Sequence, residues 1–104
     1  MTKQLVKFAV TLRDSAQAEA HDAMVRRMRE LAEAIDGFCE WRDAYEGLDY
    51  WGFVVFDSDA AAQSWKGNPT HGAIHQLGEE AVYSEFHTEV FALDRENHWY
   101  RDDG

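Results

Sequence analysis

The sequence predicts an α+β domain of the ferredoxin-like class, in which two β-α-β units share one antiparallel sheet. Three observations lead to this prediction. Apolar and polar residues alternate in four separate segments, as expected for half-buried strands. A long amphipathic stretch follows the first of these segments, and a shorter helical stretch precedes the last. The resulting order is strand-helix-strand, followed by strand-helix-strand.

The 104 residues are sufficient for a single domain with a modest core. We expect this core to span about residues 3–94, with a polar tail over 95–104. Within the core, residues 3–13 alternate and predict the first strand.

The first helix is predicted over residues 16–35. Asp14 and Ser15 precede it as cap residues, and Gly37 follows it at the position of a left-handed C-cap. Intervals of three or four residues separate the apolar side chains of its buried face, which are Ala20, Met24, Met28, Leu31 and Ile35.

Two strands follow, over residues 38–46 and 50–56, with a turn at 47–49. Alternation in the first of them places Cys39, Trp41 and Tyr45 on one face. The second is the most apolar segment of the chain and includes Trp51 and Phe53.

The second helical region begins after the cap cluster at residues 57–59 and is interrupted at Gly67. Asn68 can cap a second part that starts at Pro69, where the missing N–H has no cost, and runs to about residue 77. Gly78 is expected to end it. The last strand is predicted over 81–93, and its alternation places one set of side chains on a common face: Tyr83, Glu85, His87, Glu89 and Phe91.

Charge and composition exclude several classes of function. The formal charge of −10 opposes binding to nucleic acid and disfavours an anionic membrane. No apolar run approaches the roughly 20 residues of a membrane span, and the N-terminal residues do not form a signal peptide. Cys39 is the one cysteine, which excludes an internal disulfide and favours a cytoplasmic protein with a buried, unreactive thiol.

The predicted sheet has one face without helices. Aromatic and His side chains would lie on it, and a large exposed patch of this kind is unfavourable in water. Face-to-face pairing of two sheets would cover the patch, so we expect a homodimer.

The segment 64–75 is the strongest indication of a binding pocket. Trp65, His71 and His75 lie within eleven positions, and the two His residues share one helical face. An indole beside two imidazoles can bind a flat aromatic molecule, move protons or hold a metal. No Glu follows His71 directly, and the helix is expected to end before Glu79, so no metal site is predicted.

Structural roles for these residues remain open. Trp65 can anchor its helix on the sheet, His75 can bond to a carbonyl, and His71 can hold the interruption between the two helical parts. The aromatic residues of the second and fourth strands can line a pocket or contribute to an interface.

The segment 51–90 carries a family resemblance. Its motifs are Phe53-Val54-Val55-Phe56-Asp57-Ser58, Ala60-Ala61, Trp65, Asn68-Pro69-x-His71, Gly78 and Tyr83-Ser84-x-Phe86. With these motifs the chain resembles the antibiotic biosynthesis monooxygenase superfamily, which consists of dimeric α/β barrel proteins.

The resemblance implies one of two chemistries. Cofactor-free members oxidise polycyclic phenols with O₂, using a Trp and an Asn near the substrate. Haem-degrading members use a His as the iron ligand, a Trp ten residues before it, and an Asn on the first strand. Trp65 and His75 are ten residues apart, as in the haem-degrading members, but the first strand contains no Asn. Position 61, where some cofactor-free members have Asn, is Ala.

We therefore expect a cofactor-independent monooxygenase that acts on a planar aromatic, polyketide-like molecule. No G-x-G-x-x-G motif for a dinucleotide is present. The alternatives are haem binding through His75 and a ligand-binding dimer without catalysis. The predicted catalytic residues are His75, His71, Trp65 and Tyr83, and the predicted substrate-binding residues are Trp41, Tyr45, Trp51, Phe53, Phe86 and His87.

Overall fold

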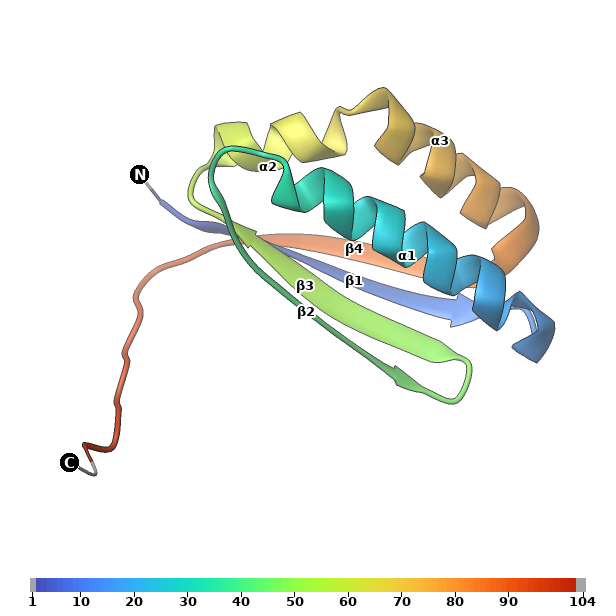
Figure 1. Cartoon of the computed structure of the whole chain (residues 1–104), viewed down its shortest axis with the longest axis horizontal. Coiled ribbons are helices and arrows are strands. Elements are labelled where there is room, and N and C mark those ends of the chain that lie inside the picture. The colour runs from blue at the N-terminus through green and yellow to red at the C-terminus, as the bar shows by residue number, and fades with distance from the viewer. Residues whose placement is uncertain (1, 103–104) are drawn as a thin grey trace.

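The computed structural model describes residues 2–102, and its four strands form one antiparallel sheet in the order β2-β3-β1-β4 (Figure 1). The first strand therefore lies in the interior of the sheet, between β3 and β4. This arrangement confirms the predicted ferredoxin-like α+β fold. The strand bounds are β1 (Gln4–Leu12), β2 (Phe38–Glu46), β3 (Asp49–Phe56) and β4 (Tyr83–Ala92).

All the helices cover the same face of the sheet (Figure 1). A short 3-10 helix η1 leads into α1, and a π-helical turn η2 continues α3 toward β4. No helix among residues 2–102 is long and apolar enough to cross a membrane. The helical bounds are η1 (Ser15–Gln17), α1 (Ala18–Glu33), α2 (Asp59–Lys66), α3 (Pro69–Leu77) and η2 (Gly78–Val82).

The predicted caps are present. The side chains of Asp14, Ser58 and Asn68 each accept a hydrogen bond from a backbone N–H of the following turn, at 2.8–3.1 Å. Gly37 has a φ of +107°, a conformation that favours glycine, but α1 ends earlier than predicted, at Glu33, and its C-cap is Ala34 in a right-handed conformation. α3 ends at Leu77 with Gly78 as its C-cap, as predicted, but the helical path does not stop there and continues as the π-helical turn η2 to Val82.

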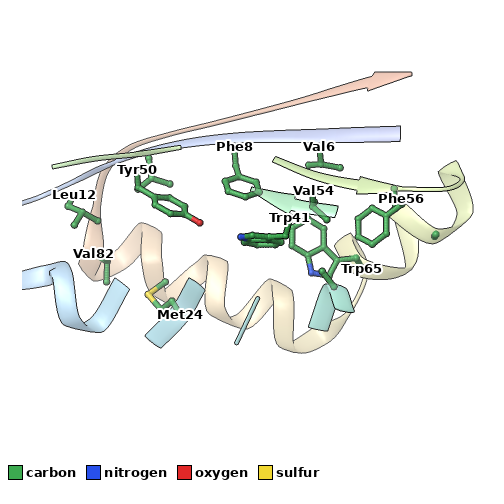
Figure 2. Close-up of a cluster of buried hydrophobic side chains, with 14 residues drawn as sticks. Val6, Phe8, Leu12, Met24, Trp41, Tyr50, Val54, Phe56, Trp65 and Val82 are labelled. Carbon is green, nitrogen blue, oxygen red and sulfur yellow. The ribbon is translucent and has the colours of Figure 1, made fainter. Parts of the chain in front are cut away.

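A core of apolar side chains lies between sheet and helices (Figure 2). Phe56 and Val54 are completely buried, and Trp65 packs on the ring of Phe56 with centroids 5.8 Å apart. Burial of a side chain of this size stabilises the fold by roughly 1.5–3 kcal/mol. The remaining core residues are Val6, Phe8, Val10, Leu12, Met24, Ala32, Trp41, Tyr50, Ala61, Ala62 and Val82.

Sheet register assigns each strand residue to a face. Trp51 and Phe53 pair with Ala9 and Lys7, on the face that carries no helix, and His87 also pairs with Ala9 on that face. We call this side of the sheet the open face.

Tyr83 does not share the face of His87, contrary to the predicted alternation. The register between β1 and β4 shifts at Thr11 and Leu12, so that Leu12 pairs with Tyr83 whereas Thr11 pairs with Glu85. The irregularity turns Tyr83 toward the helices. Cys39 lies at a similar irregularity in β2 and is exposed, so the prediction of a buried thiol is wrong.

The segment after β4 contains no helix or strand up to residue 102 and extends away from the sheet (Figure 1). Near its start, the Lys3 ammonium and the Glu96 carboxylate are 2.8 Å apart. Trp99 and Tyr100 lie further along this tail with 72% and 82% of their surface exposed.

Candidate active site

A cavity of about 220 Å³ lies between the sheet and the three α-helices. Its wall is almost entirely apolar, and every strand contributes to it. The lining residues are Val6, Phe8, Val10, His21, Met24, Val25, Met28, Trp41, Tyr50, Trp65, Lys66, His71, His75, Tyr83, Phe86 and Thr88. The cavity therefore brings together six of the predicted site residues, namely Trp41, Trp65, His71, His75, Tyr83 and Phe86.

Trp65 both anchors α2 and forms part of the cavity wall. Its indole N–H donates to the Met28 carbonyl of α1 at 3.1 Å, and its ring stands perpendicular to that of Trp41. Only 3% of the residue is exposed. The structural and ligand-binding interpretations of Trp65 are thus compatible, although its N–H is already used within the protein.

His71 packs edge-on against Trp65, with ring centroids 4.5 Å apart. Burial lowers the pKa of His71 to about 4, and the neighbouring His75 and Lys66 act in the same direction. The imidazole is therefore neutral at pH 7 and is a weak proton acceptor.

His75 lies on the same side of the cavity and meets Phe86 edge-on at 4.2 Å. Its Nδ1 is 3.2 Å from a carboxylate oxygen of Glu79. The contact exists because η2 continues the helical path beyond Gly78, one turn after His75. Among residues 2–102 no group of three His, Cys, Asp or Glu side chains is arranged to hold a metal ion.

Tyr83 closes the cavity near η2. Its ring stacks with Phe86 at 5.7 Å and lies against Gly78, where a Cβ atom would overlap the ring. Burial raises the pKa of Tyr83 to about 12, and the charge of Glu79 contributes in the same direction. The hydroxyl remains protonated at neutral pH and is able to donate a hydrogen bond.

Trp41 presents an unusual polar group. The residue is 7% exposed, and in the described part of the chain its indole nitrogen is the one side-chain N or O atom that is itself wholly inaccessible and has no hydrogen-bond partner. Tyr50 lies nearby on β3 and donates its hydroxyl to Asp43 at 2.8 Å, so it has a partner within the protein.

His21 was not predicted as a site residue, yet it is the most deeply buried polar residue of the cavity wall, with 1% exposed. Its Nδ1 is 2.6 Å from the Tyr45 hydroxyl, which in turn donates to Asp22 at 2.7 Å. The sequence did contain a signal. His21, Met24 and Met28 are spaced by three and four residues, so His21 falls on the apolar face of α1.

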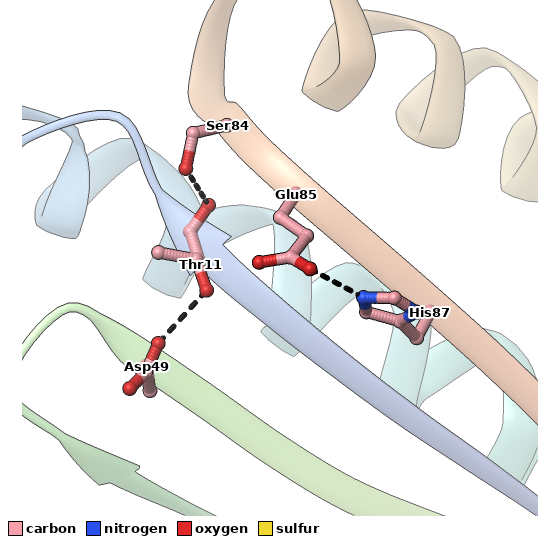
Figure 3. Close-up of polar contacts among 5 residues, drawn as sticks. All are labelled: Thr11, Asp49, Ser84, Glu85 and His87. Atoms are coloured by element: carbon pink, nitrogen blue, oxygen red, sulfur yellow. Dashed lines mark hydrogen bonds and ion pairs between the residues drawn. The ribbon is translucent and has the colours of Figure 1, made fainter.

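Four predicted substrate-binding residues do not line this cavity. Tyr45 supports His21 from outside the lining, with 44% of its surface exposed. Trp51, Phe53 and His87 lie on the open face, where the His87 ring contacts Glu85 at 2.7 Å (Figure 3). Strand alternation directs Trp51, Phe53 and His87 to the opposite side of the sheet from Trp65, so they do not line the same cavity, and their role as substrate-binding residues stays a prediction.

Fold and cavity together define a ferredoxin-like α+β domain with an apolar cavity between its sheet and helices. No protein-family model matches the chain, and no curated protein sequence matches it.

Solved structures do resemble it over nearly the whole length. Rv0793 from Mycobacterium tuberculosis has a TM-score of 0.79 at 18% identity, over 92% of this chain and 99% of the other. SnoaB from Streptomyces nogalater, a cofactor-independent oxygenase, has a TM-score of 0.77 at 12% identity, over 92% of this chain and 97% of the other. A "Putative antibiotic biosynthesis monooxygenase" from Nitrosomonas europaea has a TM-score of 0.75 at 7% identity, over 88% of this chain and 90% of the other. At these identities the likeness establishes the fold, and at that level it confirms the resemblance to the antibiotic biosynthesis monooxygenases.

Proposed function

We propose that the cavity binds a planar aromatic phenol of two or three fused rings, and that the protein oxidises this molecule with O₂ without a resident cofactor. The observation that carries the proposal is the cavity wall, in which aromatic rings and imidazole groups surround an apolar space. The shared fold with SnoaB, a cofactor-independent oxygenase, supports the same reaction class.

The volume of the cavity favours a small ligand. Ligand sites commonly measure about 300–1,000 Å³, and this one is about 220 Å³. Aromatic side chains from the sheet and from α2 present flat surfaces to it, including Phe8, Trp41 and Trp65. Such walls suit a flat ring system and exclude most of the surrounding water.

In this reaction the substrate supplies the electrons. Loss of a proton converts a phenol or an anthrone into an electron-rich anion, which transfers one electron to O₂. The resulting radical pair combines to a peroxide at the ring carbon. For an anthrone, the ring CH₂ becomes C=O, and its two hydrogens leave with the second oxygen atom as water. The protein contributes a proton acceptor, a binding surface and hydrogen bonds to the developing anion.

Oxygen uptake with 1,8-dihydroxyanthrone tests this proposal. We expect protein-dependent O₂ consumption, with one atom of ¹⁸O₂ in the quinone and the other in water. Heat-denatured protein controls for spontaneous oxidation. Val25→Phe fills the cavity and should remove most of the activity, whereas Val25→Ala at the same position should retain it. Binding of the anthrone without turnover would instead support a ligand-binding protein without catalysis.

Haem, the alternative cofactor, does not fit this cavity well. His75 lines the wall, and Glu79 could orient its ring as a metal ligand. The cavity is, however, small for a tetrapyrrole, and Lys66 is the sole Lys or Arg in its lining to receive two propionates. We therefore favour the cofactor-free reaction.

We also propose that two copies pair through the open face. Trp51 and Phe91 are each 49% exposed there, and Leu5, Ala9 and Phe53 lie between or beside them. A second copy would remove this apolar surface from water. Lys7 and Glu89 pair on the same face at 3.7 Å, so its charges are partly matched within one chain.

A further inference from the structure

The contact between His21 and Tyr45 determines which nitrogen of the buried imidazole carries the hydrogen. The Tyr45 hydroxyl has a single hydrogen and donates it to the Asp22 carboxylate, which can only accept. At 2.6 Å from the same hydroxyl oxygen, Nδ1 of His21 must therefore be the donor. The neutral ring then has its hydrogen on Nδ1 and a lone pair on Nε2.

This lone pair accepts no hydrogen bond within the described part of the chain. Nε2 of His21 has no hydrogen-bond partner among residues 2–102, although His21 lines the cavity. Burial lowers the pKa of His21, so the ring is neutral at pH 7 and the lone pair is retained. Besides Asp22 and Tyr45, the titratable groups against the ring are Tyr50 and Tyr83, at centroid distances of 4.8 and 5.7 Å.

Trp41 supplies the complementary group. Its unpaired N–H lies on the ring edge nearer to Tyr50, away from Phe56 (Figure 2). Tyr50 in turn packs edge-on against His21, with ring centroids 4.8 Å apart, and Trp41 and His21 both line the cavity. A buried donor without a partner costs about 1–3 kcal/mol, and a ligand oxygen would recover this cost.

We infer that Nε2 of His21 and Nε1–H of Trp41 form an acceptor–donor pair that recognises a hydroxyl group beside a carbonyl on an aromatic ligand. The hydroxyl donates to His21 and the carbonyl accepts from Trp41. His21 is also the proton acceptor of the reaction. For a phenol substrate, the ligand O–H bond breaks, the proton forms an Nε2–H bond, and the electron pair remains on oxygen as a phenolate. Asp22, acting through Tyr45, stabilises the imidazolium. The ligand class rests on the proposed function.

Binding of 1,2-dihydroxyanthraquinone tests the pair. This probe has a hydroxyl beside a carbonyl and is already a quinone, so binding can be measured without turnover by an absorbance titration. We expect Trp41→Phe and His21→Gln each to weaken binding about five- to tenfold, as for one lost hydrogen bond. Trp99→Phe is the control, because Trp99 lies in the exposed tail and does not line the cavity. It should leave the affinity unchanged.

A second experiment avoids substitution of a buried residue. In Asp22→Ala, the Tyr45 hydroxyl is free to donate to Nδ1 of His21, which shifts the ring toward the Nε2–H form. Side-chain ¹⁵N spectra distinguish the two forms. We expect the Nδ1–H form in the native chain, the Nε2–H form in Asp22→Ala, and weaker probe binding in this variant. Glu19→Ala, an exposed change on the same helix, should alter neither measurement.

The outcomes separate this inference from the oxygenase proposal. Tight probe binding that is indifferent to Trp41→Phe and to Asp22→Ala overturns the pair, while the ligand class stands. Binding that depends on both, without O₂ uptake by the anthrone, supports the pair and overturns the oxygenase. Absence of probe binding to the native chain overturns both the pair and the ligand class.

Discussion

The ring of Tyr83 lies so close to Gly78 that a Cβ atom at position 78 would overlap three ring and hydroxyl atoms. Gly78 has an ordinary helical conformation, with φ −59° and ψ −48°. The requirement for glycine here is therefore one of space. It allows Tyr83 to close the cavity across the turn that joins α3 to β4.

We predict that Gly78→Ala destabilises the protein by about 1–3 kcal/mol, as is typical of overpacking. Urea denaturation followed by Trp fluorescence would measure this change. Gly72→Ala is a matched control, since it lies within α3 and a Cβ there meets no neighbouring atom. Alanine at 72 should be neutral or stabilise by up to about 1 kcal/mol. Equal effects at both positions would contradict the packing of Tyr83 over Gly78.

A second prediction concerns the helix anchor. Trp65→Phe removes the indole N–H, leaves the Met28 carbonyl without its donor and opens space in the core. The expected loss of unfolding free energy is about 2–4 kcal/mol. Trp99→Phe changes an exposed tail residue and should have little effect. A stable Trp65→Phe variant would show that α2 is held by other contacts.

We predict that the free energy of unfolding decreases as the pH is lowered, because of His71. Its pKa is about 4 in the folded chain, against an ordinary value of 6.5. The unfolded chain therefore binds a proton first as the pH decreases, so stability is complete above pH 6.5 and is lost progressively toward pH 4. The imidazole of His71 contributes of the order of 2–3 kcal/mol to the free energy of unfolding in this way.

Denaturation of His71→Phe at several pH values between 7 and 4 would check this expectation. The variant should show a shallower slope, with a remainder from His21, whose pKa is also lowered. His98→Phe, in the exposed tail, is the control. An unchanged slope in His71→Phe would mean that another group governs the pH dependence.

If two copies pair through the open face, a charged substitution of Trp51 should prevent dimer formation. Sedimentation equilibrium of the native chain should give twice the monomer mass, and Trp51→Glu should give the monomer mass, because a charge would then be buried in the interface. Trp99→Glu alters an even more exposed Trp outside the sheet and should leave the dimer intact. A monomeric native chain at high micromolar concentration would remove the basis of this proposal.

A haemin titration distinguishes the two chemistries that the family resemblance implies. Because the cavity is small and has one cationic side chain, Lys66, we expect no saturable Soret shift. A shift of one haem per chain that disappears in His75→Ala would contradict the cofactor-free interpretation. A shift that persists in His75→Ala would indicate nonspecific surface binding.

The sequence alone determined the elements and their order. The fixed periods of strand and helix, the caps at Asp14, Ser58 and Asn68, and the left-handed Gly37 are local features, and each is found in the structure. Local spacing also identified Trp65, His71 and His75, which share one helical region and one side of the cavity.

Only the tertiary structure decided which distant residues meet. A single register shift between β1 and β4 separated Tyr83 from His87, and no local pattern signals such a shift. The pairing of His21 with Tyr45 and the unpaired N–H of Trp41 depend on how α1 lies over the sheet. Secondary structure follows from nearest-neighbour chemistry along the chain, whereas the hydrogen-bonding state of a buried group depends on every element packed around it.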